Sequence, residues 1–230
     1  SINDGQFLFQ TIGFSDGLIK GKSLSDFVLS PRKGLNIPNS VYDNDAQLSV
    51  YEDFIESISD LDVNALGLSF VQNGELINKI KQIKPKLAMI AKIENSEGLK
   101  NCTEVISSAD AVMIDRGDLA AEVGMSELFR SVETIACETK WAGKPLIMAT
   151  ENLETMMTRQ LPSKSEVMSL AHSISIGADC IMLSEETAIS ENGVEIVSWL
   201  DDHLKKLPDT VKYLSKQPQE KKFPEIWTML

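Results

Sequence analysis

The chain has 230 residues and a formal net charge of −12, from 34 acidic and 22 basic side chains. This acidic balance disfavours nucleic-acid and anionic-membrane binders, because the overall field repels phosphate groups. No apolar run approaches the roughly 20 residues of a membrane helix, and the sequence from Ser1 to Asp4 lacks signal-peptide features. The three cysteines are far apart, so we expect reduced thiols and a cytoplasmic protein.

The first 37 residues differ in character from the rest of the chain. Short apolar stretches, such as Gln6–Ile12, are punctuated by Gly and Asp, which predicts small β-hairpins. Pro31 and Pro38 bracket a short extended piece, Lys33–Ile37. We therefore expect residues 1–37 to form a small β segment that precedes the main domain.

From residue 38 to residue 208, strand and helix patterns alternate. Amphipathic helices, one of which opens with a capping box at Ser163 and Glu166, separate short and almost continuously apolar stretches. A single helix is expected from about Ser96 to Ser107, and the last long helix ends near Leu207. The predicted strands lie near residues 66, 90, 112, 147 and 181. This pattern predicts an α/β fold whose parallel sheet is covered by helices.

The end of the chain, residues 209–230, is predicted to be a surface tail. Lys216–Lys222 is polar and charged, and Ile226, Trp227 and Leu230 are the side chains that could dock it.

Polar residues follow four of the predicted strands, at the sheet edge where chemistry collects in parallel α/β proteins. These strand ends are Lys92–Asn95, Asp115–Asp118, Thr150–Asn152 and Ser184–Thr187. Lys92 and Glu94 are two residues apart on a strand, so their side chains lie on one face. Charged groups that point inward are unfavourable unless they are paired or bind something.

Glu94 and Asp118 lie on neighbouring strands and could supply carboxylate oxygens to Mg²⁺ or Mn²⁺. Lys92 beside that cation suits a phosphoryl group or an enolate. Gly117 lets a substrate approach the backbone, the amides after it could hold a carboxylate, and Thr150 could relay a proton. The alternative is structural: Lys92 and Glu94 form a salt bridge, and Asp118 caps a helix.

These same residues lie in segments that resemble the pyruvate kinase family, in the same order, from about residue 33 to 190. The segments are Lys33–Pro38 (similar to KGVNLPG), Ala91–Gly98 (SKIENxEG), Asp115–Leu119 (ARGDLG), Ala149–Met156 (ATQMLESM), Pro162–Glu166 (PTRAE) and Gly177–Ala188 (GADCIMLSGETA).

The resemblance implies a (β/α)₈ TIM barrel and an enzyme of glycolysis. Such an enzyme transfers phosphoryl from phosphoenolpyruvate to ADP through a Mg²⁺-bound enolate, usually with K⁺. Carried over by position, Glu94 and Asp118 would bind the metal and Lys92 would stabilise the phosphoryl group and the enolate. The amides of Gly117 and Asp118 would hold the substrate carboxylate, and Thr150 would join the proton relay.

The departures from the family pattern concern missing parts and added charges. Counterparts of the first barrel strands, with their K⁺ and nucleotide-phosphate ligands, are not found, nor is the carboxyl-terminal regulatory domain. Five strands cannot close an eight-stranded barrel, so a longer parent chain, a partner or a rearranged fold must complete it. Within the motifs, Ala120 replaces Gly, and carboxylates appear at Asp115, Glu151 and Glu185. Those charges should weaken the binding of phosphoenolpyruvate and ADP.

Three functions remain open from the sequence. The first is a pyruvate-kinase-type transferase, shortened or divergent. The second is a metal-dependent oxo-acid lyase or aldolase that uses the same metal-bound enolate chemistry. The third is a non-catalytic or regulatory relative. In each case we expect a homo-oligomer, or a partner that completes the barrel.

Overall fold

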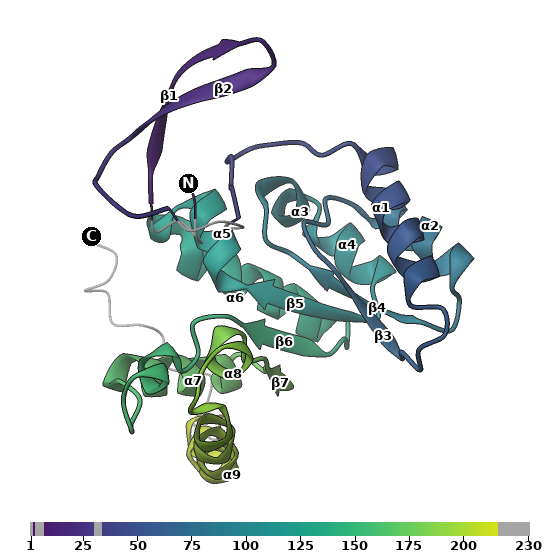
Figure 1. The fold of residues 1–230 in the computed structure, drawn as a ribbon. Coiled ribbons are helices and arrows are strands. Elements are labelled where there is room, and N and C mark those ends of the chain that lie inside the picture. The colour runs from purple at the N-terminus through teal and green to yellow at the C-terminus, as the bar shows by residue number, and fades with distance from the viewer. Residues whose placement is uncertain (1, 3–6, 30–33, 216–230) are drawn as a thin grey trace, which may run out of the picture. The chain divides into compact units, whose positions relative to one another are not determined.

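A computed structural model describes residues 2, 7–29 and 34–215, and for residues 208–215 it describes the backbone alone (Figure 1). The predictions for Lys33 and for residues 216–230 lie outside the described residues. The described residues form two compact units, one within residues 1–152 and 176–184 and the other within residues 153–175 and 185–230. The domain boundaries at residues 37 and 208 stay predictions.

The first strands form a hairpin, as predicted. β1 (Phe9–Ser15) pairs antiparallel with β2 (Leu18–Ser23). Asp16 and Gly17, at the tip, both have positive φ, 56° and 74°. Two successive residues with positive φ are typical of a type I′ turn, whose backbone twist matches that of the two flanking strands.

The centre of the first unit is a five-stranded parallel sheet, and all five predicted strands are present. Each strand pairs with the next one along the chain, so the sheet order is the chain order. The strands are β3 (Ala65–Leu68), β4 (Ala88–Lys92), β5 (Ala111–Asp115), β6 (Leu146–Ala149) and β7 (Cys180–Ile181). This is the α/β, TIM-barrel-like series of units that the sequence predicted.

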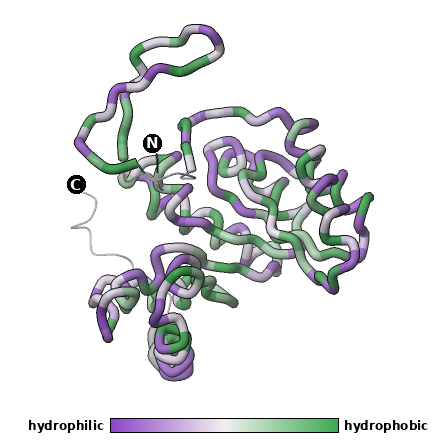
Figure 2. Tube along the Cα trace, viewed as in Figure 1, coloured by the Kyte–Doolittle hydropathy of each residue, from purple (hydrophilic) through white to green (hydrophobic). Residues whose placement is uncertain are grey.

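Helices cover one face of this sheet. They are α1 (Asn44–Ser57), α2 (Gly74–Ile83), α3 (Ser96–Lys100), α4 (Cys102–Ser108), α5 (Arg116–Val123) and α6 (Met125–Trp141). Strand residues such as Leu68, Met89 and Ile114 are fully buried in one cluster with apolar residues of α2, α4 and α6. Figure 2 shows the corresponding hydrophobic runs along the strands. The alternate side chains, such as Ile90 and Lys92, are less buried and face the other side of the sheet.

The helix predicted from Ser96 to Ser107 is two helices, because Asn101 interrupts it. Asn101 ends α3 and begins α4, with φ −96° and ψ 21°. Its side-chain amide donates to the carbonyl oxygen of Gln72, 2.9 Å away. This long-range hydrogen bond fixes the break, and a local periodicity cannot reveal it.

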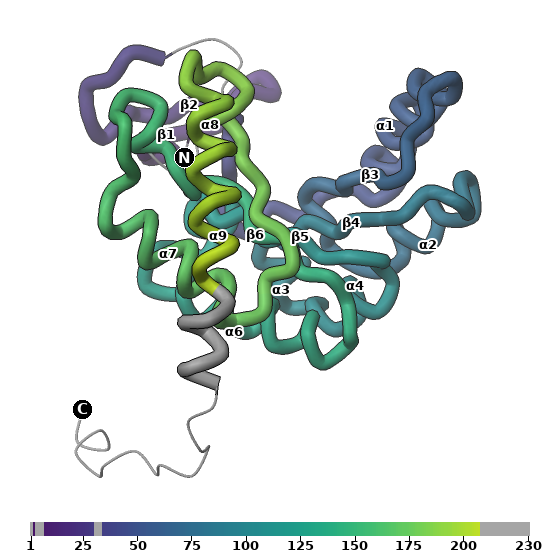
Figure 3. The backbone as a smooth tube through the Cα atoms, turned by 90° about the horizontal axis from the view of Figure 1, so that it is seen from below, coloured from purple at the N-terminus to yellow at the C-terminus, as the bar shows by residue number. Residues whose placement is uncertain are grey.

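The second unit contains η1 (Glu154–Met157), α7 (Lys164–Ser175), α8 (Glu185–Ala188) and α9 (Gly193–Ser215). α9 runs beside α7 (Figure 3). The predicted capping box is confirmed, since the Ser163 amide donates to Glu166 at 2.6 Å and the Glu166 amide donates to the Ser163 hydroxyl at 3.2 Å. The predicted end of the last helix is wrong, because α9 continues through Pro208. A proline removes one helical hydrogen bond, and the helix can still continue past it.

In the described part of the chain, no helix is long and apolar enough to cross a membrane.

Candidate functional site

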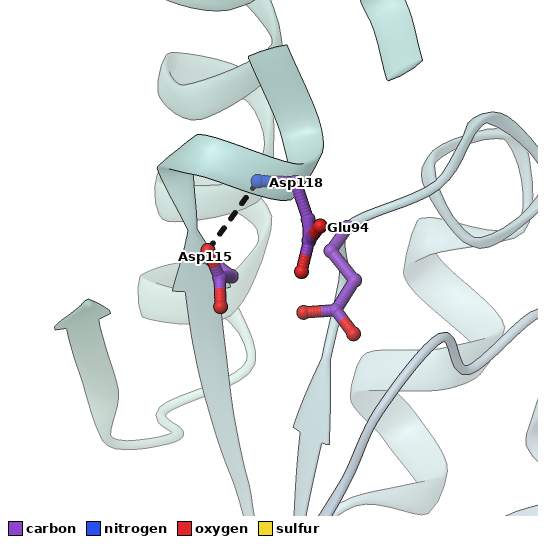
Figure 4. Close-up of side chains that lie close together, drawn as sticks. All are labelled: Glu94, Asp115 and Asp118. Atoms are coloured by element: carbon purple, nitrogen blue, oxygen red, sulfur yellow. Dashed lines mark hydrogen bonds between the residues drawn. The ribbon is translucent and has the colours of Figure 1, made fainter. Parts of the chain in front are cut away.

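Three carboxylates meet where β4 and β5 end. Glu94 follows β4, Asp115 ends β5 and Asp118 lies in the first turn of α5. One oxygen from each carboxylate lies within 4.8 Å of the others (Figure 4). The sequence predicted Glu94 and Asp118 at this edge. It gave Asp115 no ligand role.

Glu94 is fully buried and only partly satisfied. Its Oε1 accepts a hydrogen bond of 2.7 Å from the Phe70 amide, and that amide is presented by a left-handed backbone with φ 53°. Its Oε2 has no hydrogen bond within the described residues, although it lies 3.0 Å from Lys92 Nζ. Burial raises the pKa of Glu94 to about 7, and the Lys92 charge opposes that rise. A second positive charge is therefore favourable beside this carboxylate.

The Lys92 ammonium lies between two carboxylates. Its Nζ is 3.0 Å from Glu94 Oε2 and 3.2 Å from Asp115 Oδ2. Burial by itself lowers the pKa of Lys92, but the charges of Glu94 and Asp115 outweigh burial and hold the pKa above its ordinary value. The ammonium group is therefore charged at neutral pH. The structural salt bridge that the sequence left open is present, and it lies within the same cluster.

Asp115 links the cluster to β6. It is the N-cap of α5, and its Oδ1 accepts from the Asp118 amide at 3.4 Å. The Thr150 hydroxyl lies 3.1 Å from the same oxygen. The signal in the sequence was its position as the last residue of an apolar strand, and the structure places it level with Ala149 on β6.

Thr150 and Gly117 lie together at the end of β6. The Gly117 amide donates to Thr150 Oγ1 at 3.1 Å. The structure thus brings Gly117, Asp118 and Thr150 together, but the two amides predicted to hold a substrate carboxylate donate to side chains of the chain itself.

Arg116 organises the loop that carries Thr150, and sequence reasoning missed it. Its guanidinium donates to the Glu151 carbonyl at 3.1 Å and to Asn152 Oδ1 at 2.9 Å. Thr150 and Glu151 both have positive φ, 61° and 50°. Such backbone conformations are unfavourable for these residues and persist only when their surroundings hold them.

The two other added carboxylates are not members of this group of three. The Glu151 side chain is exposed, and Glu185 begins α8 in the second unit.

The donor set fits a hard divalent cation. Three carboxylates lie around one ammonium group, and the buried Glu94 carboxyl, whose pKa is raised to about 7, loses its proton more readily when a cation binds. Oxygen ligands are those that Mg²⁺ and Mn²⁺ prefer, and Glu94 Oε2 is a buried acceptor that lacks a hydrogen bond within the described residues.

Residues 1–197 match a family model described as the barrel domain of pyruvate kinase. Among curated proteins, the chain is 30% identical over 219 residues to a pyruvate kinase of Hypocrea jecorina and 33% identical over 203 residues to one of Thermococcus litoralis. These alignments cover 93% and 86% of this chain, and 41% and 43% of the relatives. The chain therefore spans about two fifths of the length of these relatives.

Solved structures give the same result. A crystal structure of a pyruvate kinase from Cryptosporidium parvum matches with a TM-score of 0.77 at 27% identity, covering 98% of this chain and 50% of that one. A structure of Cryptosporidium parvum pyruvate kinase in complex with ADP matches with a TM-score of 0.80 at 28% identity, covering 90% of this chain and 43% of that one.

Proposed function

The chain belongs to the pyruvate kinase family, and from this premise we propose that it carries the metal-binding and phosphoryl-binding part of an enzyme that transfers phosphoryl from phosphoenolpyruvate to ADP. The observation that carries the proposal is the juxtaposition of Lys92, Glu94 and Asp118 at one sheet edge. Membership alone would not carry it, because related proteins can share a fold and differ in function.

Glu94 and Asp118 are the residues that would hold a divalent metal ion. When bound, such an ion stabilises negative charge on the oxygens of the reacting groups. Lys92 adds a fixed positive charge next to it, and its raised pKa keeps that charge present at neutral pH. A preorganised cation of this kind stabilises the charge that develops on a transferring phosphoryl group.

Thr150 is the proposed proton-relay residue. Its hydroxyl accepts from the Gly117 amide at 3.1 Å and lies 3.1 Å from Asp115 Oδ1. It therefore has a fixed acceptor role and a carboxylate within reach, which suits a hydroxyl that passes a proton to a substrate carbon.

The amides of Gly117 and Asp118 are proposed to bind the substrate carboxylate. In this structure they donate to Thr150 and Asp115. Substrate binding at these amides therefore requires that the substrate replace those two acceptors.

Calorimetric titration of the purified protein with Mn²⁺ tests the metal site. Glu94→Gln should weaken Mn²⁺ binding by about tenfold or more, because the variant removes a buried anionic ligand. Glu127→Gln, an exposed residue of α6, is the matched control and should bind Mn²⁺ like the wild type. Equal Mn²⁺ affinity in the wild type and Glu94→Gln would contradict the proposed site.

The reaction is tested with the complete native assembly. Pyruvate formation from phosphoenolpyruvate that requires both ADP and the metal ion supports the transferase. Metal-dependent oxalate binding without ADP binding would instead favour an oxo-acid lyase or aldolase, because oxalate resembles the enolate of pyruvate. Absence of any metal or oxalate binding would leave the non-catalytic alternative.

A further inference from the structure

We propose that Asp115 is a built-in competitor for the anionic group of the substrate, and that it shifts the preference of the site toward ligands with less negative charge. This inference rests on the proposed function and concerns the same site.

Asp115 contacts donors that an anionic ligand of the site would use. The Lys92 ammonium, the Asp118 amide and the Thr150 hydroxyl lie 3.2, 3.4 and 3.1 Å from its carboxylate oxygens. The Thr150 hydroxyl also lies 2.8 Å from the Ala149 carbonyl oxygen, so Asp115 shares this donor. These groups come from three consecutive strands or the turns that follow them. They are the groups that a substrate phosphate or carboxylate would need.

Burial and its partners hold the Asp115 carboxylate in place. Asp115 is 6% exposed, and both of its oxygens have partners, Oδ2 with Lys92 and Oδ1 with Asp118 and Thr150. A buried carboxylate held by a cation and by hydrogen bonds is not displaced without replacing those interactions. An incoming anion has to supply equivalent acceptors.

Asp115 also lies at the amino terminus of α5. A helix amino terminus attracts anions through its free amides and its dipole. Asp115 is the N-cap there, so the chain has already placed a carboxylate at this position. The attraction of this helix terminus for anions therefore already acts on the Asp115 carboxylate of the protein itself.

Charge counting shows which ligands are affected. With a divalent cation bound, the charges of the cation, of Lys92 and of the three carboxylates cancel to about zero. Without the Asp115 charge, the same site has a charge of about +1. Because the Coulomb term scales with the charge of the ligand, removal of this charge favours phosphoenolpyruvate more than pyruvate.

The test compares Asp115→Asn and Asp115→Ala with the wild type, using the purified protein saturated with Mn²⁺. Calorimetry gives the dissociation constants of phosphoenolpyruvate and of pyruvate. We expect both variants to bind phosphoenolpyruvate about tenfold more tightly, with a smaller change for pyruvate. Glu151→Gln removes an exposed charge at a neighbouring strand end, and we expect a change of less than about twofold because solvent screens that charge.

Two outcomes would contradict the proposed role of Asp115. Phosphoenolpyruvate affinity that is unchanged or weaker in both variants, with thermal unfolding showing that they are folded, would overturn the inference. A loss of Mn²⁺ affinity of about tenfold or more in both variants would also overturn it, since Asp115 would then be a metal ligand.

The Glu94→Gln titration keeps the two proposals apart. Mn²⁺ binding that depends on Glu94, with no gain in phosphoenolpyruvate affinity in the Asp115 variants, would remove the competitor role alone. Tighter phosphoenolpyruvate binding in those variants, with no ADP phosphorylation by the complete assembly, would support the competitor role and contradict the transferase.

Discussion

Gly98 allows α3 to approach the segment after β3 more closely than any other residue would permit. A Cβ atom at this position would lie 2.2 Å from the Val71 carbonyl oxygen. The Gly98 amide donates to Asn95 Oδ1 at 2.7 Å, and Asn95 is the neighbour of Glu94. This close contact therefore helps to fix the position of the buried Glu94 carboxylate.

We predict that Gly98→Ala lowers the free energy of unfolding by about 1–3 kcal/mol, because the added methyl group meets a backbone atom that cannot rotate away. Gly67→Ala is the matched control. No atom lies within 4 Å of a Cβ built at Gly67, so the change should be within about 0.5 kcal/mol. Urea unfolding of the three proteins measures both values. A Gly98→Ala variant as stable as the wild type would show that α3 can move.

At the residue scale, part of the site could be predicted from the sequence. The spacing of Lys92 and Glu94 placed both side chains on one face, and the structure shows them 3.0 Å apart. The contacts of Asp115 could not be predicted. They depend on the pairing of three strands and on the left-handed backbone of Thr150, which Arg116 supports from a distance in sequence.

At the element scale, two aspartates repeat the same connection between a helix and two strands. Asp110 precedes β5, accepts from the Met89 amide at 2.8 Å and pairs with Lys81 of α2. Asp179 precedes β7, accepts from the Leu146 amide at 2.8 Å and pairs with Lys140 of α6. Each aspartate thus joins its own strand to the start of the neighbouring strand and to the helix that precedes that neighbouring strand.

These connections should make stability sensitive to acid. Partial burial favours a higher pKa for Asp110 and Asp179, but the hydrogen bonds from Lys81 and Lys140 and from the backbone amides outweigh it and lower both pKa values. A carboxylate with a lowered pKa contributes stability above its unfolded pKa of about 3.9, and that contribution disappears as the pH falls through the folded pKa.

We therefore predict that Asp110→Asn and Asp179→Asn each lower stability at neutral pH by about 1 kcal/mol, since both side chains are partly exposed. The double variant should lose less stability than the wild type between about pH 5 and pH 3. Thermal unfolding across this range checks both points. Asp60→Asn, in the exposed segment after α1, should retain the wild-type pH dependence. A double variant with an unchanged acid slope would contradict the proposed linkage.

Elements were easier to predict where the signals are local. The capping box at Ser163 and Glu166 requires only residues that are three apart, and it forms. The break between α3 and α4 requires the Gln72 carbonyl, which is 29 residues from Asn101. Local patterns therefore predicted the five strands of the sheet and most of the helices. Tertiary hydrogen bonds determine where some of the helices end.

At the scale of the whole molecule, the sheet formed by the described residues has two unpaired edges. Within the described residues, β3 and β7 each pair with a single strand. The matched relatives are more than twice as long, and an eight-stranded barrel needs strands beyond these five. The sequence predicted both the five strands and the open edge, because each βα unit has its own local signature. It could not indicate which polypeptide provides the remaining strands.

We predict that the 230-residue polypeptide, purified by itself, associates through the edge of β3. The Asn64 carbonyl accepts from the Ala88 amide, so the backbone N–H and C=O groups of alternate residues, beginning with Asn64, point toward β4. The backbone N–H and C=O groups of Ala65 and Gly67 point toward the unpaired edge. Ala65→Pro removes a hydrogen-bond donor from that edge at the first position of the strand, where proline is tolerated. Sedimentation velocity should show concentration-dependent association of the wild type up to about 100 µM and much less for Ala65→Pro.

Ala65→Ser keeps the amide donor and is the control that should associate like the wild type. If Ala65→Pro associates as strongly as Ala65→Ser, then β3 is not the contact, and β7 is the edge to block next. If the wild-type polypeptide stays monomeric over the whole concentration range, residues of the chain itself protect both edges. The association state therefore reports directly whether the five strands need others beside them, as an open parallel sheet requires.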